Sequence, residues 1–214
     1  MVDDRYWRIY DRRLGRPGFS GGRPEDKQFQ QLLVRWFEWG CFCPVMRLHG
    51  DRECDDRRVF HADGSPALFT GGNNEVWSFG EANEKILTSY IFLRELMRPY
   101  TRKLMEEAHL YGKPVMRPMF YEFPEQDICW ELKEQYMFGP SILVAPILYE
   151  DQTERTVYLP SGYKWTLLSD GTVYEGGQTI HVTAPLEQIP VFISEDGPDL
   201  VEGWKKIREE QGIC

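Results

Sequence analysis

The sequence has no apolar run approaching the roughly 20 residues that a membrane-spanning helix needs. Residues 1–11 carry charge throughout, where a signal peptide would have an apolar region. Positive charge is also in short supply, with 25 Lys and Arg against 34 Asp and Glu and a formal net charge of -9. A chain with this charge repels phosphate backbones on average. We therefore expect a soluble, cytoplasmic protein with no membrane and no nucleic acid among its partners.

Cysteine is scarce, and its spacing is not that of a metal site. The chain has an odd number of cysteines, namely Cys41, Cys43, Cys54, Cys129 and Cys214. A chain of 214 residues is too large to need a disulfide framework. Neither the C-x-x-C nor the H-x-x-x-H spacing of structural zinc sites is present. We expect reduced thiols and no metal.

The chain is also short for a complete βα barrel with a second domain. A complete eight-fold βα barrel typically takes about 250 residues, so 214 residues cannot hold one together with a second domain. Aromatic residues are plentiful in comparison, at 14% of the chain. Aromatic rings can stack on sugars, but they are also common core residues, so composition alone leaves both uses open.

The first part of the chain has the pattern of an α/β fold. Apolar spacing predicts a helix over 24–39, a buried strand over 41–46 and, after a long polar loop at 50–80, a helical region over 81–111 that Pro99 interrupts. A second buried strand is predicted over 115–121, and a short helix over 127–136. Polar residues follow both predicted strands, at the strand ends where α/β folds place their sites.

The period then changes to that of an all-β domain. Short apolar segments separated by Gly, Pro and Asp turns predict an antiparallel β-sandwich, with strands over 142–145, 155–159, 164–168, 179–183 and 189–193. A polar helix is predicted over 199–210. We divide the chain into an atypical N-terminal stretch, a barrel portion, a sandwich and a helical tail, at residues 1–17, 18–137, 138–196 and 197–214. The fold class is thus α/β plus all-β.

Several short motifs, in this order, carry a family resemblance. They are Arg35-Trp36, Met46-Arg47-Leu48-His49, Arg98-Pro99-Tyr100, Met116-Arg117-Pro118, Glu122-Phe123-Pro124, Gln135-Tyr136-Met137-Phe138-Gly139 and Val144-Ala145-Pro146. Between about residues 18 and 193 the chain resembles glycoside hydrolase family 31, which contains α-glucosidases and α-xylosidases. The resemblance implies the C-terminal portion of a (β/α)8 barrel followed by a proximal β-sandwich.

The resemblance also implies a retaining glycosidase, which needs two carboxyl groups roughly 5–5.5 Å apart. In the family, the nucleophile lies in a Trp-x-Asp-x-Asn-Glu motif and the acid/base in a Trp-x-Gly-Asp motif, and both precede the matched region. Neither motif occurs in this sequence. We therefore assign no catalytic residue, interpret Glu122 as structural support, and expect the chain to be inactive alone.

Four residues are candidates for substrate binding. His49 matches the family histidine that hydrogen-bonds sugar hydroxyls, and Phe19 resembles the aromatic residue of an Asp-Ile-Gly-Gly-Phe motif, of which this chain lacks the aspartate. Arg47 either braces its loop or contacts substrate, and Trp77, with Phe79, either walls the sugar cleft or anchors the long loop. Arg35 and Trp36 are interpreted as packing residues. Five arginines among residues 1–17 suggest that this stretch is foreign to the ancestral reading frame.

The expected function is that of part of an α-xylosidase-like enzyme that releases terminal α-linked xylose or glucose from oligosaccharides, with no cofactor. The Met-Arg-Leu-His-Gly motif ending at Gly50 and the loop after it favour xylose over glucose. The alternative is a non-catalytic sugar-binding or oligomer-forming remnant. The partners are thus an oligosaccharide and, in a homo-oligomer, a second copy of the chain.

Overall fold

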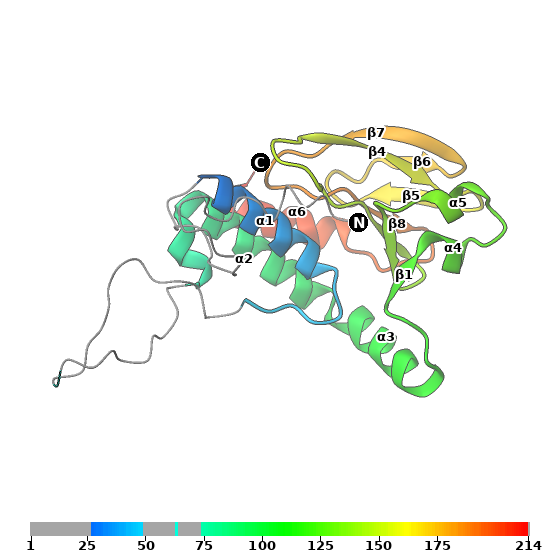
Figure 1. Ribbon diagram of the computed structural model, residues 1–214, viewed down its shortest axis with the longest axis horizontal. Helices are drawn as coiled ribbons and strands as arrows, with labels where there is room; N and C mark the ends of the chain where they lie inside the picture. Colours follow the sequence, from blue (N-terminus) through cyan, green and yellow to red (C-terminus); the bar gives the residue numbers. More distant parts are fainter. Residues whose placement is uncertain (1–26, 49–62, 64–73, 214) are drawn as a thin grey trace.

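A computed structural model describes residues 27–48, 63 and 74–213 (Figure 1). The helices are α1 (Lys27–Cys41), the 3₁₀ helix η2 (Val76–Phe79), α2 (Glu81–Leu96), α3 (Arg98–Tyr111), α4 (Met119–Glu122), α5 (Ile128–Glu131) and α6 (Val201–Gln211). The strands are β1 (Met116–Pro118), β2 (Tyr136–Phe138), β3 (Ile142–Val144), β4 (Glu154–Leu159), β5 (Lys164–Leu167), β6 (Val173–Glu175), β7 (Gln178–Thr183) and β8 (Val191–Ser194).

The strands form two antiparallel sheets. The larger sheet has the order β1-β2-β3-β8-β5-β6, and the smaller pairs β4 with β7. Residues opposite one another include Met137 with Leu143 and Leu143 with Phe192. Figure 1 shows the small sheet stacked over the large one, which confirms the expected β-sandwich.

The central strands β3 and β8 of the larger sheet are buried on both faces, which explains their largely apolar sequences. Successive side chains point to opposite faces, so Leu143 and Phe192 join a core with Val157 and Val182 of the small sheet. Their neighbours on the other face join a second core with the helices, and they include Ile142, Val144, Val191 and Ile193. The molecule therefore has three layers: helices, large sheet and small sheet.

The helical layer consists of α1, α2 and α6, with α3 projecting away from it (Figure 1). Tyr90 of α2 and Trp204 of α6 are both buried, with ring centroids 5.2 Å apart. A single residue, Met97, separates α2 from α3, which confirms the break predicted at Pro99. Gly112 ends α3 with φ of 68°, a left-handed conformation that glycine adopts without steric cost.

Three sequence expectations need correction. Residues 42–48 are irregular rather than a strand, and β1 covers only the start of 115–121 before the chain turns into α4. β1 also pairs antiparallel with β2, not in a parallel sheet. The helix predicted over 127–136 is limited to α5, since the backbone becomes extended at Leu132 and Tyr136 begins β2. A sandwich boundary at residue 137 stays a prediction, and β2 spans that position.

Candidate functional site

Two of the four predicted sugar-binding residues lie in the described part of the chain. Arg47 lies in the irregular segment after α1 and is exposed. Trp77 lies in η2, with 66% of its surface exposed. Phe19 and His49 lie outside the described residues. The roles given to all four stay predictions.

The backbone just before Arg47 is held by side chains from other elements. The Arg94 guanidinium of α2 donates hydrogen bonds to the carbonyl oxygens of Cys41, Cys43 and Pro44, at 2.7, 2.6 and 2.8 Å. Tyr136 of β2 donates to the carbonyl of Phe42 at 3.0 Å. The chain then reaches the surface, since Val45 is 75% exposed. The segment is thus fixed at its base and open to solvent at its end.

The two aromatic residues of η2 have different surroundings. Phe79 is fully buried, with its ring centroid 6.1 Å from that of Phe29 on α1. Its carbonyl also accepts a hydrogen bond of 2.8 Å from the Asn83 side chain. Phe79 therefore anchors η2 to the helical layer. The indole of Trp77 remains largely accessible, as a residue that contacts a ligand would be.

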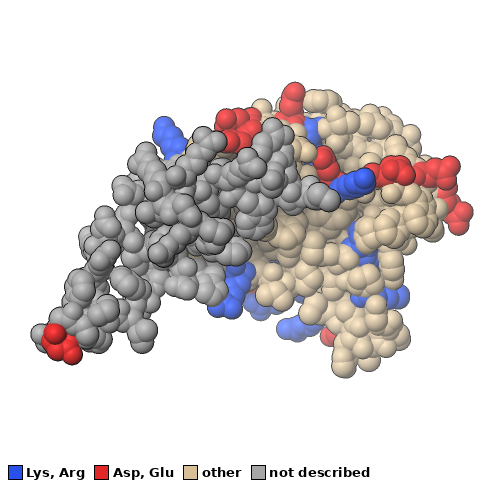
Figure 2. Space-filling model, in the orientation of Figure 1, with Lys and Arg blue, Asp and Glu red and all other residues tan. Residues whose placement is uncertain are grey.

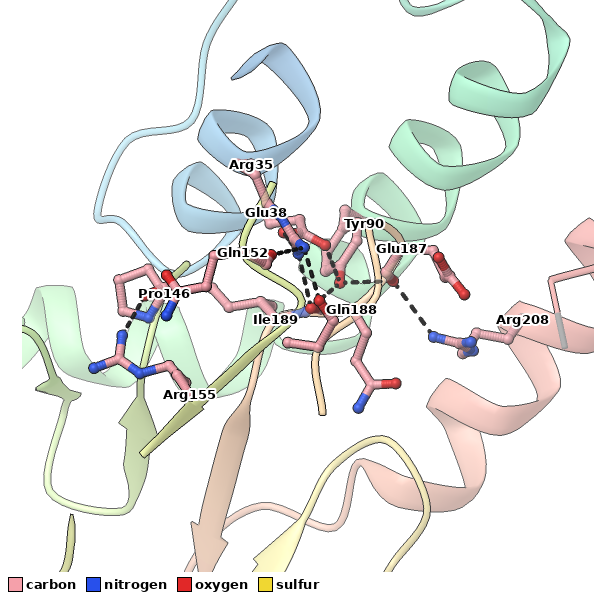
Figure 3. Close-up of polar contacts among 11 residues, drawn as sticks. Arg35, Glu38, Tyr90, Pro146, Gln152, Arg155, Glu187, Gln188, Ile189 and Arg208 are labelled. Carbon is pink, nitrogen blue, oxygen red and sulfur yellow. Dashed lines mark hydrogen bonds and ion pairs between the residues drawn. The ribbon is translucent and has the colours of Figure 1, made fainter. Parts of the chain in front are cut away.

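A buried polar cluster joins the helices to the loops around the sandwich (Figure 3). Arg35 of α1 donates a hydrogen bond of 3.1 Å to the Glu38 carboxyl. Its guanidinium also donates to three backbone carbonyls from other parts of the chain, those of Gln152, Ala184 and Gln188 at 3.3, 2.8 and 3.0 Å. The sequence interpretation of Arg35 as a packing residue is therefore incomplete, since the side chain also ties α1 to the loops after β3 and β7.

Tyr90 completes this cluster from α2. Its hydroxyl lies 3.1 Å from Glu38 Oε1 and accepts a hydrogen bond of 3.2 Å from the Ile189 N–H. Burial raises the pKa of Glu38 from 4.5 to about 8, against the opposing effect of Arg35. A raised carboxyl pKa is typical of a general acid. Glu38 is only 1% exposed, however, so no substrate reaches it and its role is structural.

Glu122, at the end of α4, also has a structural partner. Its carboxylate accepts a hydrogen bond from the Arg117 guanidinium, whose Nε donates to the Pro114 carbonyl at 2.7 Å. Arg117 is buried, at 5% exposure. These contacts agree with the interpretation of Glu122 as structural support. The acidic residues around Asp51 lie outside the described residues.

Charged side chains are unevenly spread over the surface. Figure 2 shows Lys and Arg mostly toward the lower edge, where Figure 1 places α3, and Asp and Glu mostly over the sheets. A shallow hollow of about 280 Å³ lies on α3, lined by Arg98, Pro99, Arg102, Lys103 and Glu106. With three cationic side chains and one carboxylate, this hollow cannot supply the pair of carboxyl groups that glycoside hydrolysis needs.

The described ranges contain neither a candidate metal centre nor a membrane-spanning helix. Within residues 27–48 and 74–213, no group of three His, Cys, Asp or Glu side chains could hold a metal ion. No helix among the same residues is long and apolar enough to cross a lipid bilayer. Cys41, Cys43 and Cys129 are free thiols and buried.

Two domains of one enzyme family match most of the chain. Residues 17–104 match the TIM-barrel domain of glycosyl hydrolase family 31. Residues 112–197 match the C-terminal domain of the same family. The match confirms the expected fold class, part of a barrel followed by a β-sandwich.

The similar proteins include α-xylosidases and α-glucosidases. Alpha-xylosidase A of Aspergillus niger is 34% identical over 85% of this chain and 25% of its own length. The α-xylosidase of Saccharolobus solfataricus is 34% identical over 82% of this chain and 22% of its own. A soil-metagenome α-xylosidase of family 31, solved with xylose, is 48% identical with a TM-score of 0.79, over 88% of this chain and 28% of its own. The chain thus spans about a quarter of the length of these relatives.

Proposed function

Because this chain belongs to glycoside hydrolase family 31, we propose that it is part of a retaining α-glycosidase that releases terminal α-linked xylose, or glucose, from oligosaccharides. The observation that carries the proposal is the 48% identity and TM-score of 0.79 to an α-xylosidase solved with xylose. The α-xylosidases of Aspergillus niger and Saccharolobus solfataricus support xylose as the sugar. The buried free thiols support a reducing, cytoplasmic location.

In this proposal the chain supplies binding groups rather than the reacting carboxylates. A retaining mechanism needs a nucleophile and an acid/base roughly 5–5.5 Å apart. The two family motifs that carry them do not occur in the sequence. Of the described carboxylates considered as candidates, Glu38 is enclosed and Glu122 is paired with Arg117. The chain therefore contributes one wall of the sugar site, and the reaction needs carboxyl groups that this chain does not supply.

Each candidate residue has a chemical task at that wall. His49 hydrogen-bonds sugar hydroxyls, since an imidazole can both donate and accept. The guanidinium of Arg47, at the end of a segment held by Arg94, offers further donors to ring hydroxyls. The exposed indole of Trp77 stacks on the apolar face of a pyranose, with Phe19 as a second aromatic contact.

A second candidate function is a non-catalytic, oligomer-forming remnant. Large apolar side chains are exposed along α2 and α3, including Phe92 at 48%, Leu110 at 65% and Tyr111 at 70%. Exposed apolar side chains that gather into a patch often mark an interface between proteins. In this case the chain would assemble with copies of itself and would still bind sugar without hydrolysing it.

The purified chain, assayed on aryl α-xylosides and α-glucosides, tests the proposal. We expect no turnover. Turnover that disappears on substitution of Asp51, Asp55 or Glu122 would show that the chain holds its own catalytic carboxylate. Saturable xylose binding without turnover, lost in His49→Ala, supports the sugar wall, and self-association of the chain in addition favours the remnant.

A chimera tests the enzyme proposal directly. Residues 18–196 would replace the matching part of the soil-metagenome α-xylosidase, which keeps its own remaining segments. We expect α-xylosidase activity that falls in His49→Ala and Trp77→Ala. Trp130→Ala is the matched control, because Trp130 is also an exposed tryptophan, at 56%, but lies on α5. An active chimera that tolerates both site substitutions would refute the assigned roles.

A further inference from the structure

The C-terminal end of α1 is completed by residues from elsewhere in the chain. The last carbonyls of an α-helix have no partner within the helix, and the helix dipole favours a cation beside them. α1 has no basic residue in its last turn. The missing cation comes from α2, because Arg94 donates 2.7 Å and 2.6 Å hydrogen bonds to the carbonyls of Cys41 and Cys43.

The arrangement continues over four successive residues. The carbonyls of residues 41, 43 and 44 accept from Arg94, and that of residue 42 accepts from Tyr136. The Arg94 guanidinium also lies 5.9 Å from the ring centroid of Phe138, which is fully buried. A guanidinium can hold several carbonyls at once because its donors form a rigid fork, which an ammonium group lacks. The backbone over 41–44 is therefore fixed from both α2 and β2.

We propose that Arg94 and Tyr136 are positioning residues for the sugar-binding segment, and we call the pair the carbonyl clamp. Arg47 follows Pro44 by three residues, so its Cα lies no more than about 11 Å from the last clamped residue. The clamp thereby determines where Arg47 is presented, and it links that position to the large sheet through β2. The sugar-contacting part of this inference rests on the proposed function, whereas the ordering of the segment does not.

The clamp can be tested on the whole 214-residue chain with three variants and one control. Arg94→Met removes every donor but keeps an apolar stem, Arg94→Lys keeps the charge on a single nitrogen, and Tyr136→Phe removes one hydroxyl. Lys85→Met is the control, because Lys85 is also on α2 but forms an exposed ion pair with Glu81. Two quantities would be measured in each: amide hydrogen exchange at Phe42 and Cys43, whose N–H groups donate to the carbonyls of Trp39 and Gly40, and affinity for an aryl α-xyloside.

We expect exchange at Phe42 and Cys43 in Arg94→Met to rise by about tenfold or more, the effect of losing a charge-assisted hydrogen bond. Xyloside affinity should fall several-fold, while the melting temperature and the exchange of α6 stay near those of the wild type. Arg94→Lys and Tyr136→Phe should show smaller changes of the same kind, and Lys85→Met none. If Arg94→Met unfolds, the two milder variants decide the question.

Unchanged exchange at Phe42 and Cys43 in a folded Arg94→Met chain would overturn the clamp. Faster exchange with unchanged xyloside affinity would overturn its role in positioning. If the wild-type chain binds no xyloside, the proposed sugar wall fails in this chain, and the exchange measurement still decides whether the clamp orders the segment.

Discussion

The buried carboxyl of Glu38 should make the stability of the protein fall as pH rises. Burial raises its pKa in the folded chain to about 8, whereas its ordinary value is 4.5. Between these two pH values the folded state keeps a proton that the unfolded state has released. The free energy of unfolding therefore decreases with pH across this window and levels off above it. This direction is opposite to that of a carboxylate stabilised mainly by an ion pair.

The size of the effect follows from the same two values. At ~1.4 kcal/mol per pH unit, the gap of about 3.5 between 4.5 and about 8 sets an upper limit of ~5 kcal/mol. Between pH 5 and pH 7.5 the expected loss is ~3 kcal/mol. Small domains commonly have a total stability of about 5–15 kcal/mol, so such a loss is large enough to measure.

Glu38→Gln isolates this contribution, because glutamine does not titrate. Its side chain can still accept a hydrogen bond from Arg35 and form one with the Tyr90 hydroxyl. Urea unfolding followed by tryptophan fluorescence would be measured for both chains from pH 5 to pH 8.5. We expect the wild type to lose stability relative to Glu38→Gln as pH rises. The comparison cancels the repulsion from the net charge of -9 that both chains nearly share. A flat difference, or one of opposite sign, would show that Arg35 keeps the carboxylate ionised and would refute the reasoning.

Three further results are expected. Trp77→Ala should change the unfolding free energy by less than ~0.5 kcal/mol, because Trp77 is 66% exposed. Phe79→Ala should lower the unfolding free energy by ~3–5 kcal/mol, because it empties a core position. Equal losses of unfolding free energy in urea titrations of the two variants would contradict this expectation. Gly139→Ala should lower the unfolding free energy by ~2–4 kcal/mol. The φ angle of Gly139 is 65°, and an added Cβ would collide with the Tyr100 hydroxyl. An unchanged melting temperature would exclude that collision. Burial raises the pKa of the Cys41 thiol well above its usual range. Because the thiolate is the reactive form, iodoacetamide at pH 8 should label Cys41 roughly 100-fold more slowly in the native chain than in urea, as measured by peptide mapping. Equal labelling would mean that α1 opens readily.

The longer helices and most strands could be predicted because their patterns are local. The apolar face of α1 and the continuous apolar run of β3 each identify an element without reference to the rest of the chain. The run over 41–46 misled for a physical reason. A strand and an irregular segment that enter the core are equally apolar. What distinguishes the irregular segment here is that its carbonyls bind the Arg94 and Tyr136 side chains, which lie far away in the sequence. Strand β2 was missed because the helix predicted over 127–136 took in its first residue, Tyr136, and left only two residues for a strand.

Contacts between distant residues explain what the sequence did not reveal about the site. Arg35 receives its carbonyl partners from positions 117 to 153 residues away, which no local pattern predicts. Trp77 and Phe79 are two residues apart in the same 3₁₀ helix, yet one faces solvent and the other the core. The assignments of His49 and Phe19 depend on the family resemblance, and they stay predictions alongside those of Arg47 and Trp77.

The large sheet contributes side chains to two cores at once, so unfolding of one core affects the other. Ile142 packs on the helices and its neighbour Leu143 packs on the small sheet, so neither core can open without loosening the other. Cleavage near Gly112, between the segments that match the two family domains, would leave each piece with an uncovered apolar face. The two matched domains are therefore inseparable as folding units, and the protein should melt in one cooperative transition.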